Sequence, residues 1–137
     1  VFCGGGMNHR ADLESMVLIK DNHRQAVSNN LSISEAIKQV RGKTRKQLMI
    51  EVDTLTQFKE ALNTEADFIL LDNMDPQQIE RCVDLKTKKR GKKPKLEASG
   101  GINLSNIQRY ARTGVDRISI GALTHTVKAV DVSMEID

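Results

Sequence analysis

The chain has 137 residues and a mass of 15.3 kDa, which suffices for one domain but not for two of ordinary size. With 39% hydrophobic and 28% charged residues, its composition is that of a soluble globular protein and excludes collagen-like, low-complexity and disordered classes. No apolar run approaches the roughly 18 residues of a membrane span, and no secretory signal is visible. We therefore expect one domain over residues 1–137, a cytoplasmic location and no membrane partner.

The net charge of +3 and the isoelectric point near 9.0 come from one stretch of sequence. Residues 86–95, KTKKRGKKPK, contain seven of the 21 basic residues and no acidic one, so the remainder has 14 basic and 18 acidic residues. Three Phe, one Tyr and no Trp give little aromatic surface on which nucleic-acid bases could stack. We expect a solvated, poorly ordered loop at 86–95 and no nucleic-acid partner.

The two cysteines, Cys3 and Cys82, stand in no spacing typical of metal ligands. A cytosolic chain keeps its thiols reduced, so a disulfide is not expected. We expect both to be small buried residues.

Short apolar runs that end at a polar residue or a glycine predict strands. Five such runs occur, at residues 16–19, 48–52, 68–71, 96–99 and 118–120.

Start and stop signals between these runs predict four helices. Ser32 lies three residues before Glu35, which is the spacing of a capping box, and Gly42 stops that helix. The other helices begin at Thr54 with Gln57 three residues on, at Asp75-Pro76 with Gln78, and at Ser105, the last with Gly114 as its C′ residue.

Strands that alternate with helices through connections too long for hairpins indicate parallel strands joined by crossovers. The predicted fold class is therefore α/β with a parallel sheet. In such sheets and barrels, ligands bind at the carboxyl ends of the strands.

Charged or small residues lie at the carboxyl ends of all five predicted strands. A lone carboxylate there is more often a helix cap or a surface ion-pair member, but the coincidence at all five strand ends favours a functional pocket. The residues are Lys20, then Glu51, then Asp72, then Ser99, Gly100 and Gly101, and last Gly121 and Ala122.

The glycine turns after the last two strands predict a phosphate site, because missing side chains let backbone amides approach an anion. The helices expected from about Ser105 and Thr124 would direct their N-termini to the same place. For Gly100-Gly101, a tight turn that needs positive φ is an equally good interpretation.

A second concentration of functional residues lies at the N-terminus. Gly4-Gly5-Gly6 permits close backbone approach to a ligand, and His9 and Arg10 follow directly. Together with Lys20 they could hold a small molecule with more than one carboxylate. His23 and His125 also lie just past strand ends, and as single histidines we expect them to support the site from its edge.

At these residues the sequence resembles the quinolinate phosphoribosyltransferases, over essentially the whole chain and in the family's order. The matching runs are GGGMNHR (4–10), LIKDNH (18–23), IEVDTLTQFKEAL (50–62), DFILLDNM (67–74), LEASGGI (96–102), TGVDRISIGALTH (113–125) and VDVSMEI (130–136).

The resemblance implies a reaction of quinolinate with phosphoribosyl pyrophosphate that yields nicotinate mononucleotide, pyrophosphate and CO₂ with Mg²⁺. It implies that His9, Arg10 and Lys20 bind the quinolinate carboxylates, and that Lys20, Glu51 and Asp72 act in catalysis. Glu51 and Asp72 would face the ribose and the metal-bound pyrophosphate. The 5′-phosphate would bind at Ser99, Gly100, Gly101, Gly121 and Ala122, with His125 close by.

The resemblance also implies a larger assembly. Family chains are about twice this long, with an N-terminal domain and the first strands of a TIM-like barrel, and they act as dimers. The chain begins at Val1 rather than Met, so we expect a C-terminal α/β-barrel fragment that is inactive alone. Thr44-Arg45-Lys46 has the letters of a family substrate motif but follows His9-Arg10, so we carry no role over to it.

Two other hypotheses stay open. A phosphoribosyltransferase-like protein such as those found with molybdenum transport would share the phosphate turns, but the His9, Arg10 and Lys20 cluster argues against it. A non-catalytic phosphate-binding or assembly fragment would bind ligand without turnover.

Overall fold

The computed structural model describes residues 1–10, 15–26, 31–125 and 129–136, and it contains a five-stranded parallel sheet. The strands are β1 (Val17–Ile19), β2 (Leu48–Val52), β3 (Phe68–Asp72), β4 (Lys95–Ser99) and β5 (Arg117–Ile118). Each strand pairs with its sequence neighbour, in the order β1-β2-β3-β4-β5. Barrels have this sequential order, whereas doubly wound sheets reverse it at a switch point. The predicted α/β class with parallel strands is confirmed.

The strand bounds agree with the sequence pattern best at the centre of the sheet. β2 has the predicted bounds, and β3 and β4 are each one residue longer. β5 was predicted at 118–120 but begins and ends earlier. Its ladder nevertheless continues past its end, because the Ser119 N–H donates to the Ala98 carbonyl at 2.9 Å.

Three helices begin at the capping residues that the sequence indicates. They are α2 (Ile33–Arg41), α3 (Leu55–Leu62) and α4 (Pro76–Lys88), and their N-caps are Ser32, Thr54 and Asp75. At α2 the capping box is complete: Ser32 Oγ accepts from the Glu35 N–H at 3.2 Å, and the Glu35 carboxylate accepts from the Ser32 N–H at 3.0 Å.

The later helices are shorter than predicted or displaced. α5 (Ile107–Ala111) starts two residues after Ser105, because Asn103 Oδ1 accepts the Ser105 N–H at 2.9 Å and holds a turn there. Gly114 has φ 80 and lies two residues after the C-cap Arg112. The helix expected from about Thr124 is α6 (Ala122–His125).

Two elements have no counterpart in the predictions. They are the 3₁₀ turn η1 (Phe2–Gly4) and the helix α1 (Asp21–Gln25). Both are too short to show an apolar period.

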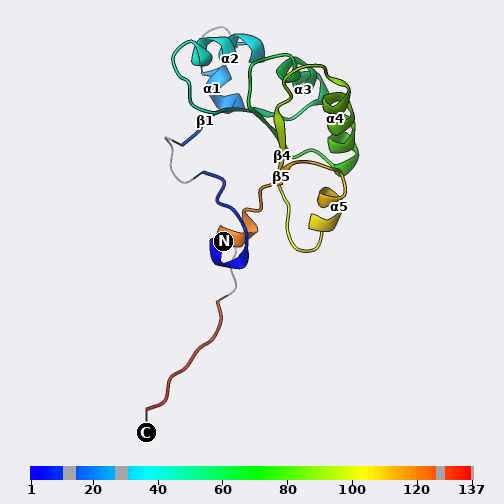
Figure 1. The fold of residues 1–137 in the computed structure, drawn as a ribbon. Helices are drawn as coiled ribbons and strands as arrows, with labels where there is room; N and C mark the ends of the chain where they lie inside the picture. The colour runs from blue at the N-terminus through cyan, green and yellow to red at the C-terminus, as the bar shows by residue number, and fades with distance from the viewer. Residues whose placement is uncertain (11–14, 27–30, 126–128, 137) are drawn as a thin grey trace.

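The two faces of the sheet differ, because side chains alternate along each strand. One face, which includes Ile50, Ile69 and Leu96, packs against α2, α3 and α4 in the main core. On the other face Met49, Phe68 and Leu70 form a smaller apolar cluster with Met16. Figure 1 shows α2, α3, α4 and α5 following one another around the outside of the strands, with the N-terminal segment beside α6.

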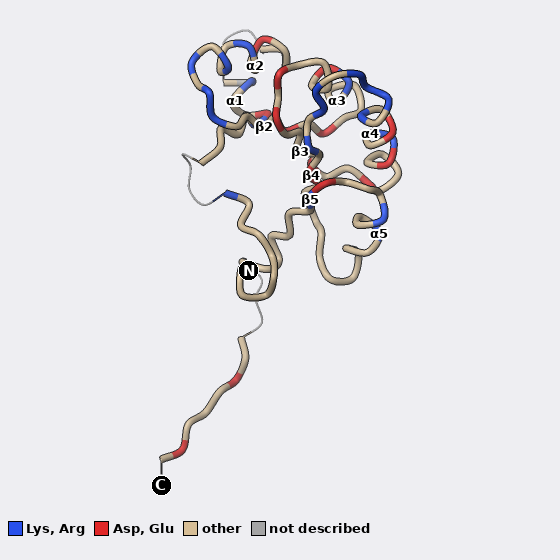
Figure 2. The backbone as a smooth tube through the Cα atoms, in the orientation of Figure 1, with Lys and Arg blue, Asp and Glu red and all other residues tan. Residues whose placement is uncertain are grey.

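The stretch 86–95 is largely exposed, as predicted, but the prediction of a poorly ordered loop is wrong. Lys86–Lys88 form the last turn of α4, and Lys95 opens β4. Lys86 Nζ lies 2.5 Å from Asp116 Oδ2, and Lys92 Nζ lies 2.6 Å from Asp67 Oδ1. Figure 2 shows this basic stretch in blue close to α4.

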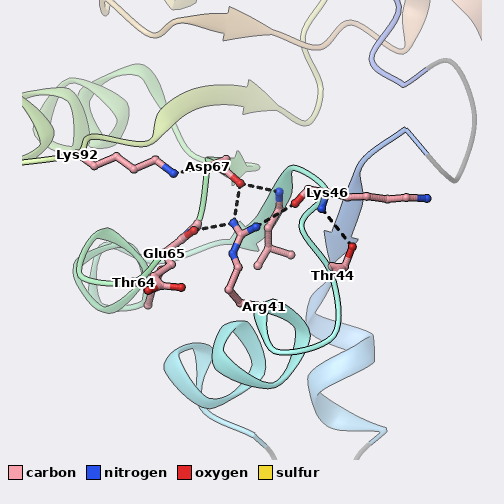
Figure 3. Close-up of polar contacts among 9 residues, drawn as sticks. Arg41, Thr44, Lys46, Thr64, Glu65, Asp67 and Lys92 are labelled. Carbon is pink, nitrogen blue, oxygen red and sulfur yellow. Dashed lines mark hydrogen bonds and ion pairs between the residues drawn. The ribbon is translucent and has the colours of Figure 1, made fainter.

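Asp67 joins the basic stretch to the end of α2. Arg41 donates to Asp67 Oδ2 at 2.6 Å, and the same oxygen accepts the Leu48 N–H at 3.0 Å (Figure 3). Burial alone would raise the pKa of Asp67, but the hydrogen bonds from Lys92, Arg41 and Leu48 outweigh it and hold the pKa below its ordinary value. The basic residues therefore neutralise aspartates that tie neighbouring strands together at their amino ends.

The two cysteines differ in burial. Cys82 is buried as predicted, and burial raises the pKa of its thiol to about 12. Cys3 is exposed, so that prediction is wrong, because η1 lies outside the core.

The C-terminal segment 129–136 extends away from the sheet (Figure 1). Its apolar residues Val130, Val132, Met134 and Ile136 alternate with polar ones and are 82–84% exposed. Within the described ranges, no helix combines the length and the apolar character that a membrane crossing needs.

Candidate functional site

A pocket of about 1000 Å³ opens at the carboxyl ends of the strands, on the face of the sheet opposite α2, α3 and α4. The sheet topology brings together side chains that lie more than a hundred residues apart in sequence. Except for His23, the predicted site residues line this pocket: His9, Arg10, Lys20, Glu51, Asp72, Ser99, Gly100, Gly101, Gly121, Ala122 and His125.

Strand register places the polar residues of the pocket in layers. Glu51 pairs with Leu70, Leu70 with Glu97, and Glu97 with Arg117, so these four form one row across four strands. Asp72 pairs with Ser99 in the next row toward the carboxyl ends. Because residues two apart share a face, both rows project to the pocket side, and Leu70 of the first row is also part of the apolar cluster.

Lys20 and Glu51 form an ion pair across one wall of the pocket. Lys20 Nζ lies 3.3 Å from Glu51 Oε2, and the lysine side chain is about half exposed while the glutamate is buried. Lys20 directly follows β1, and its backbone N–H donates to His23 Nδ1 at 3.0 Å. His23 thus helps to begin α1 and is not among the residues that line the pocket, whereas His125 is.

Asp72 ends β3, and its carboxylate accepts a hydrogen bond from Asn73 Nδ2 at 2.8 Å. Asn73 has φ 53, and its N–H donates to the Ser99 carbonyl at 2.9 Å. This turn carries the chain away from the sheet and leaves Asp72 at the pocket rim.

The two glycines after β4 serve different purposes. A Cβ on Gly100 would collide with the Asn73 side chain and lie 2.8 Å from the Asn73 nitrogen, so the turn itself requires glycine. Gly101 has φ 62 and no atom within 4 Å of the place of a Cβ, so its surroundings are open. A Cβ on Gly121 would meet the His125 ring. Both glycines have the positive φ that the turn interpretation expects, and only the surroundings of Gly101 also leave room for an anion.

The polar residues of the pocket that sequence reasoning missed include Glu97, Arg117 and Ser119. Glu97 is 2% exposed, and its carboxylate accepts a hydrogen bond from the Ser119 hydroxyl and lies 3.1 Å from His9 Nε2. Arg117 approaches the same carboxylate at 4.0 Å. The signal was present in LEAS, where an acidic residue interrupts an apolar strand two positions before the predicted phosphate-binding Ser99.

The described residues include no group of three or more His, Cys, Asp and Glu that could hold a metal ion by themselves. Glu51 and Asp72 still supply carboxylate oxygens at the pocket. Mg²⁺ is commonly held by one or two carboxylates together with substrate phosphates, and this donor set fits that mode.

Fold and pocket together define a parallel α/β protein with a mixed cationic and acidic site at the carboxyl ends of its strands. The profile of the C-terminal domain of quinolinate phosphoribosyl transferase matches residues 1–135. The chain belongs to the quinolinate phosphoribosyltransferase family.

Relatives and solved structures agree with this assignment. A Methanocaldococcus jannaschii protein named probable nicotinate-nucleotide pyrophosphorylase (carboxylating) is 44% identical across 99% of this chain and 48% of its own length. The Mycobacterium leprae nicotinate-nucleotide pyrophosphorylase (carboxylating) is 40% identical, over 97% of this chain and 46% of its own length. The Francisella tularensis structure of that name has a TM-score of 0.84 at 36% identity, covering 96% of this chain and 45% of the other. The chain therefore spans about half the length of the relatives it matches.

Proposed function

We propose that the protein transfers a phosphoribosyl group to quinolinate in NAD biosynthesis. The substrates are quinolinate and phosphoribosyl pyrophosphate, and the products are nicotinate mononucleotide, pyrophosphate and CO₂. The observation that carries the proposal is the convergence of the predicted cationic, acidic and glycine-rich residues in one pocket.

Quinolinate carries two adjacent carboxylates, and the proposal assigns them to His9, Arg10 and Lys20. All three line the pocket and come from the N-terminal segment and the end of β1. Lys20 lies 3.3 Å from Glu51, so part of its charge is already matched. Arginine and lysine bind carboxylates through charge-assisted hydrogen bonds, which orient the ring for attack.

The acidic residues act on the ribose. As the pyridine nitrogen bonds to the anomeric carbon, the carbon–oxygen bond to pyrophosphate breaks and positive charge develops on the ribosyl carbon. Glu51 and Asp72 stabilise that charge electrostatically. The ring nitrogen is then cationic and stabilises the electron pair that stays on the neighbouring ring carbon when CO₂ leaves. A proton takes the place of CO₂, and exclusion of water from the pocket favours this step.

The 5′-phosphate binds at the glycine turns in this proposal. Ser99, Gly100 and Gly101 follow β4, and Gly121 and Ala122 follow β5, so the two turns lie at adjacent strand ends. Backbone N–H groups without neighbouring side chains are suited to an anion. His125 lines the same part of the pocket.

Mg²⁺ is part of the proposal, with Asp72 and Glu51 as the residues that would hold it, directly or through water. Asp72 is the better placed of the two, since Glu51 is paired with Lys20. When bound with pyrophosphate, the ion would neutralise negative charge on this leaving group. An assembly of two or more copies and a cytoplasmic location complete the proposal, and the family resemblance is their support.

Product analysis tests the proposal. The protein as its gene encodes it is incubated with quinolinate, phosphoribosyl pyrophosphate and Mg²⁺, and nicotinate mononucleotide is quantified by chromatography. We expect product in equal amount to the CO₂ released, and none with nicotinate in place of quinolinate. Binding of phosphoribosyl pyrophosphate without turnover would instead favour the phosphate-binding alternative.

A further inference from the structure

Glu97 is a buried carboxylate inside a pocket that we propose for anionic substrates. It lies in the middle of β4 and is 2% exposed. Burial of a charge is costly unless the charge is paired and hydrogen-bonded, and a carboxylate here would also repel an anionic ligand. Its contacts must therefore offset both effects.

Three groups from two separate parts of the chain meet the Glu97 carboxylate. The Ser119 hydroxyl donates to Oε1, and His9 Nε2 lies 3.1 Å from the same oxygen. Arg117 Nη1 lies 4.0 Å from Oε2. The guanidinium carbon of Arg117 is also 4.5 Å from the centre of the Phe68 ring, so Arg117 is held between an aromatic face and a carboxylate.

The contact with His9 joins the N-terminal segment to the sheet. Residues 1–9 are exposed, and the segment includes three consecutive glycines, of which Gly5 has φ 79. A glycine-rich segment has many accessible backbone conformations, so the orientation of His9 depends on what its ring binds. With Nε2 donating to Glu97, Nδ1 is the ring nitrogen left for a ligand, and it donates to a carboxylate in the imidazolium form, in which both nitrogens carry a proton.

We propose that Glu97 is a positioning residue for the dicarboxylate substrate. It holds His9 by Nε2 and keeps Arg117 in place on Phe68, so that the imidazole and the guanidinium are both oriented before the substrate binds. This role rests on the proposed function. It predicts that loss of the Glu97 charge weakens quinolinate binding and leaves phosphoribosyl pyrophosphate binding unchanged.

The test compares the wild-type protein, as its gene encodes it, with Glu97→Gln, His9→Ala and the double variant. For each, the KM of quinolinate and the KM of phosphoribosyl pyrophosphate are measured separately. We expect Glu97→Gln to raise the quinolinate KM about tenfold or more and to change the phosphoribosyl pyrophosphate KM less than about twofold. The double variant should lose less quinolinate affinity than the sum of the two single effects, because part of the Glu97 effect acts through His9.

Controls separate positioning from general loss of structure. Glu80→Gln removes the same charge from an exposed position on α4 and should change neither KM. If Glu97→Gln does not fold, Ser119→Ala replaces it, since it removes only the hydroxyl that holds the same carboxylate. We expect the same selective rise in quinolinate KM, of about two- to fivefold.

Two outcomes would overturn the role in distinguishable ways. A wild-type protein that turns over quinolinate, with equal KM shifts for both substrates or fully additive effects of His9 and Glu97, removes the positioning role alone. A wild-type protein that neither binds nor turns over quinolinate overturns the proposed function and this role with it.

Discussion

At the scale of single residues, Lys20 links the carboxylate-binding and acidic parts of the pocket. Lys20→Ala removes a proposed quinolinate ligand and leaves Glu51 without its ion-pair partner at 3.3 Å. We expect the quinolinate KM to rise or turnover to fall at least tenfold, which corresponds to about 1.4 kcal/mol. Steady-state kinetics with varied quinolinate measures this. Near-wild-type values in the folded variant would remove Lys20 from the site.

The two pocket carboxylates should differ in their kinetic effects. Asp72→Asn should lower kcat by about tenfold or more with little change in either KM, since its charge matters most as the ribosyl cation develops. Glu51→Gln should lower kcat and also raise the quinolinate KM, because Glu51 contacts Lys20. A change confined to KM in Asp72→Asn would contradict the role of that carboxylate.

The glycines after β4 offer a matched pair. Gly100→Ala should lower the melting temperature, since its Cβ collides with Asn73. Gly101→Val meets no neighbouring atom but is strained by the positive φ, so it should lower the melting temperature less than a collision would, and the folded variant should lose phosphoribosyl pyrophosphate affinity about tenfold or more. Calorimetric titration and thermal melting together measure both effects. Unchanged affinity in Gly101→Val would show that Gly101 only shapes the turn.

The sequence predicted those site residues whose functional side chain lies at the end of a strand. Lys20, Asp72 and Ser99 lie at or just after the ends of their strands and line the pocket. Glu97 and Arg117 were missed although Glu51 in the same row was predicted, since their partners come from distant parts of the chain. Such pairing depends on strand register, which spacing within one segment does not reveal.

At the scale of elements, the basic stretch 86–95 should affect stability more than catalysis. It joins α4 to the amino end of β4, away from the pocket at the carboxyl ends. Replacing its lysines with serine should leave kcat/KM within about twofold. It should also lower the melting temperature, because Lys86 and Lys92 pair with Asp116 and Asp67. Replacing only the exposed Lys88 and Arg90 is the matched control and should change neither quantity.

The aspartates at the amino ends of the strands predict a dependence of stability on pH. Burial would raise the pKa of Asp116, but the Leu96 N–H and Lys86 outweigh it and lower the pKa, as occurs at Asp67. Such a carboxyl has a lower pKa in the folded state than in the unfolded state, where it is near 3.8. Its charge therefore stabilises the fold at pH values above 3.8, and this contribution is lost as the pH falls through the folded-state pKa. Asp67→Asn should therefore cost about 1.5–3 kcal/mol near neutral pH and much less in strong acid.

Urea unfolding of the wild type and of Asp67→Asn, at neutral pH and at about pH 3, measures this difference. An equal loss of unfolding free energy at both values would show that the charge of Asp67 does not stabilise the fold.

Helix starts were predictable where one side chain satisfies the first N–H groups, as at Ser32, Thr54 and Asp75. The short helices were not, because hydrogen bonds around them decide their bounds. Asn103 delays α5, and α1 begins where His23 accepts from Lys20. That residues 86–95 are well ordered was also missed, because their order depends on ion pairs with Asp67 and Asp116, which come from two other loops.

At the scale of the whole molecule, the 137-residue chain should self-associate when expressed by itself. In the described residues β1 and β5 each pair on one side only, and unpaired strand edges favour association. The segment 129–136 adds four exposed apolar residues in alternation. Deleting 129–137 should reduce the apparent mass in light scattering, and an unchanged mass would exclude that segment as a cause.

The same chain should be inactive by itself. The resemblance places a further substrate-binding arginine and lysine in the earlier half of the family chain and implies a partner subunit at the site. Assay of verified 137-residue material for nicotinate mononucleotide tests this, and restored turnover on mixing with a separately expressed N-terminal half would support it. Turnover by the pure 137-residue chain would contradict it.

The most direct test of the pocket assignment is the position of quinolinate in a crystal of the protein as its gene encodes it. We predict that its two carboxylates contact His9, Arg10 and Lys20, with the ring nitrogen facing Glu51 and Asp72. Well-defined density for quinolinate outside this pocket, in a protein that turns it over, would contradict the assignment.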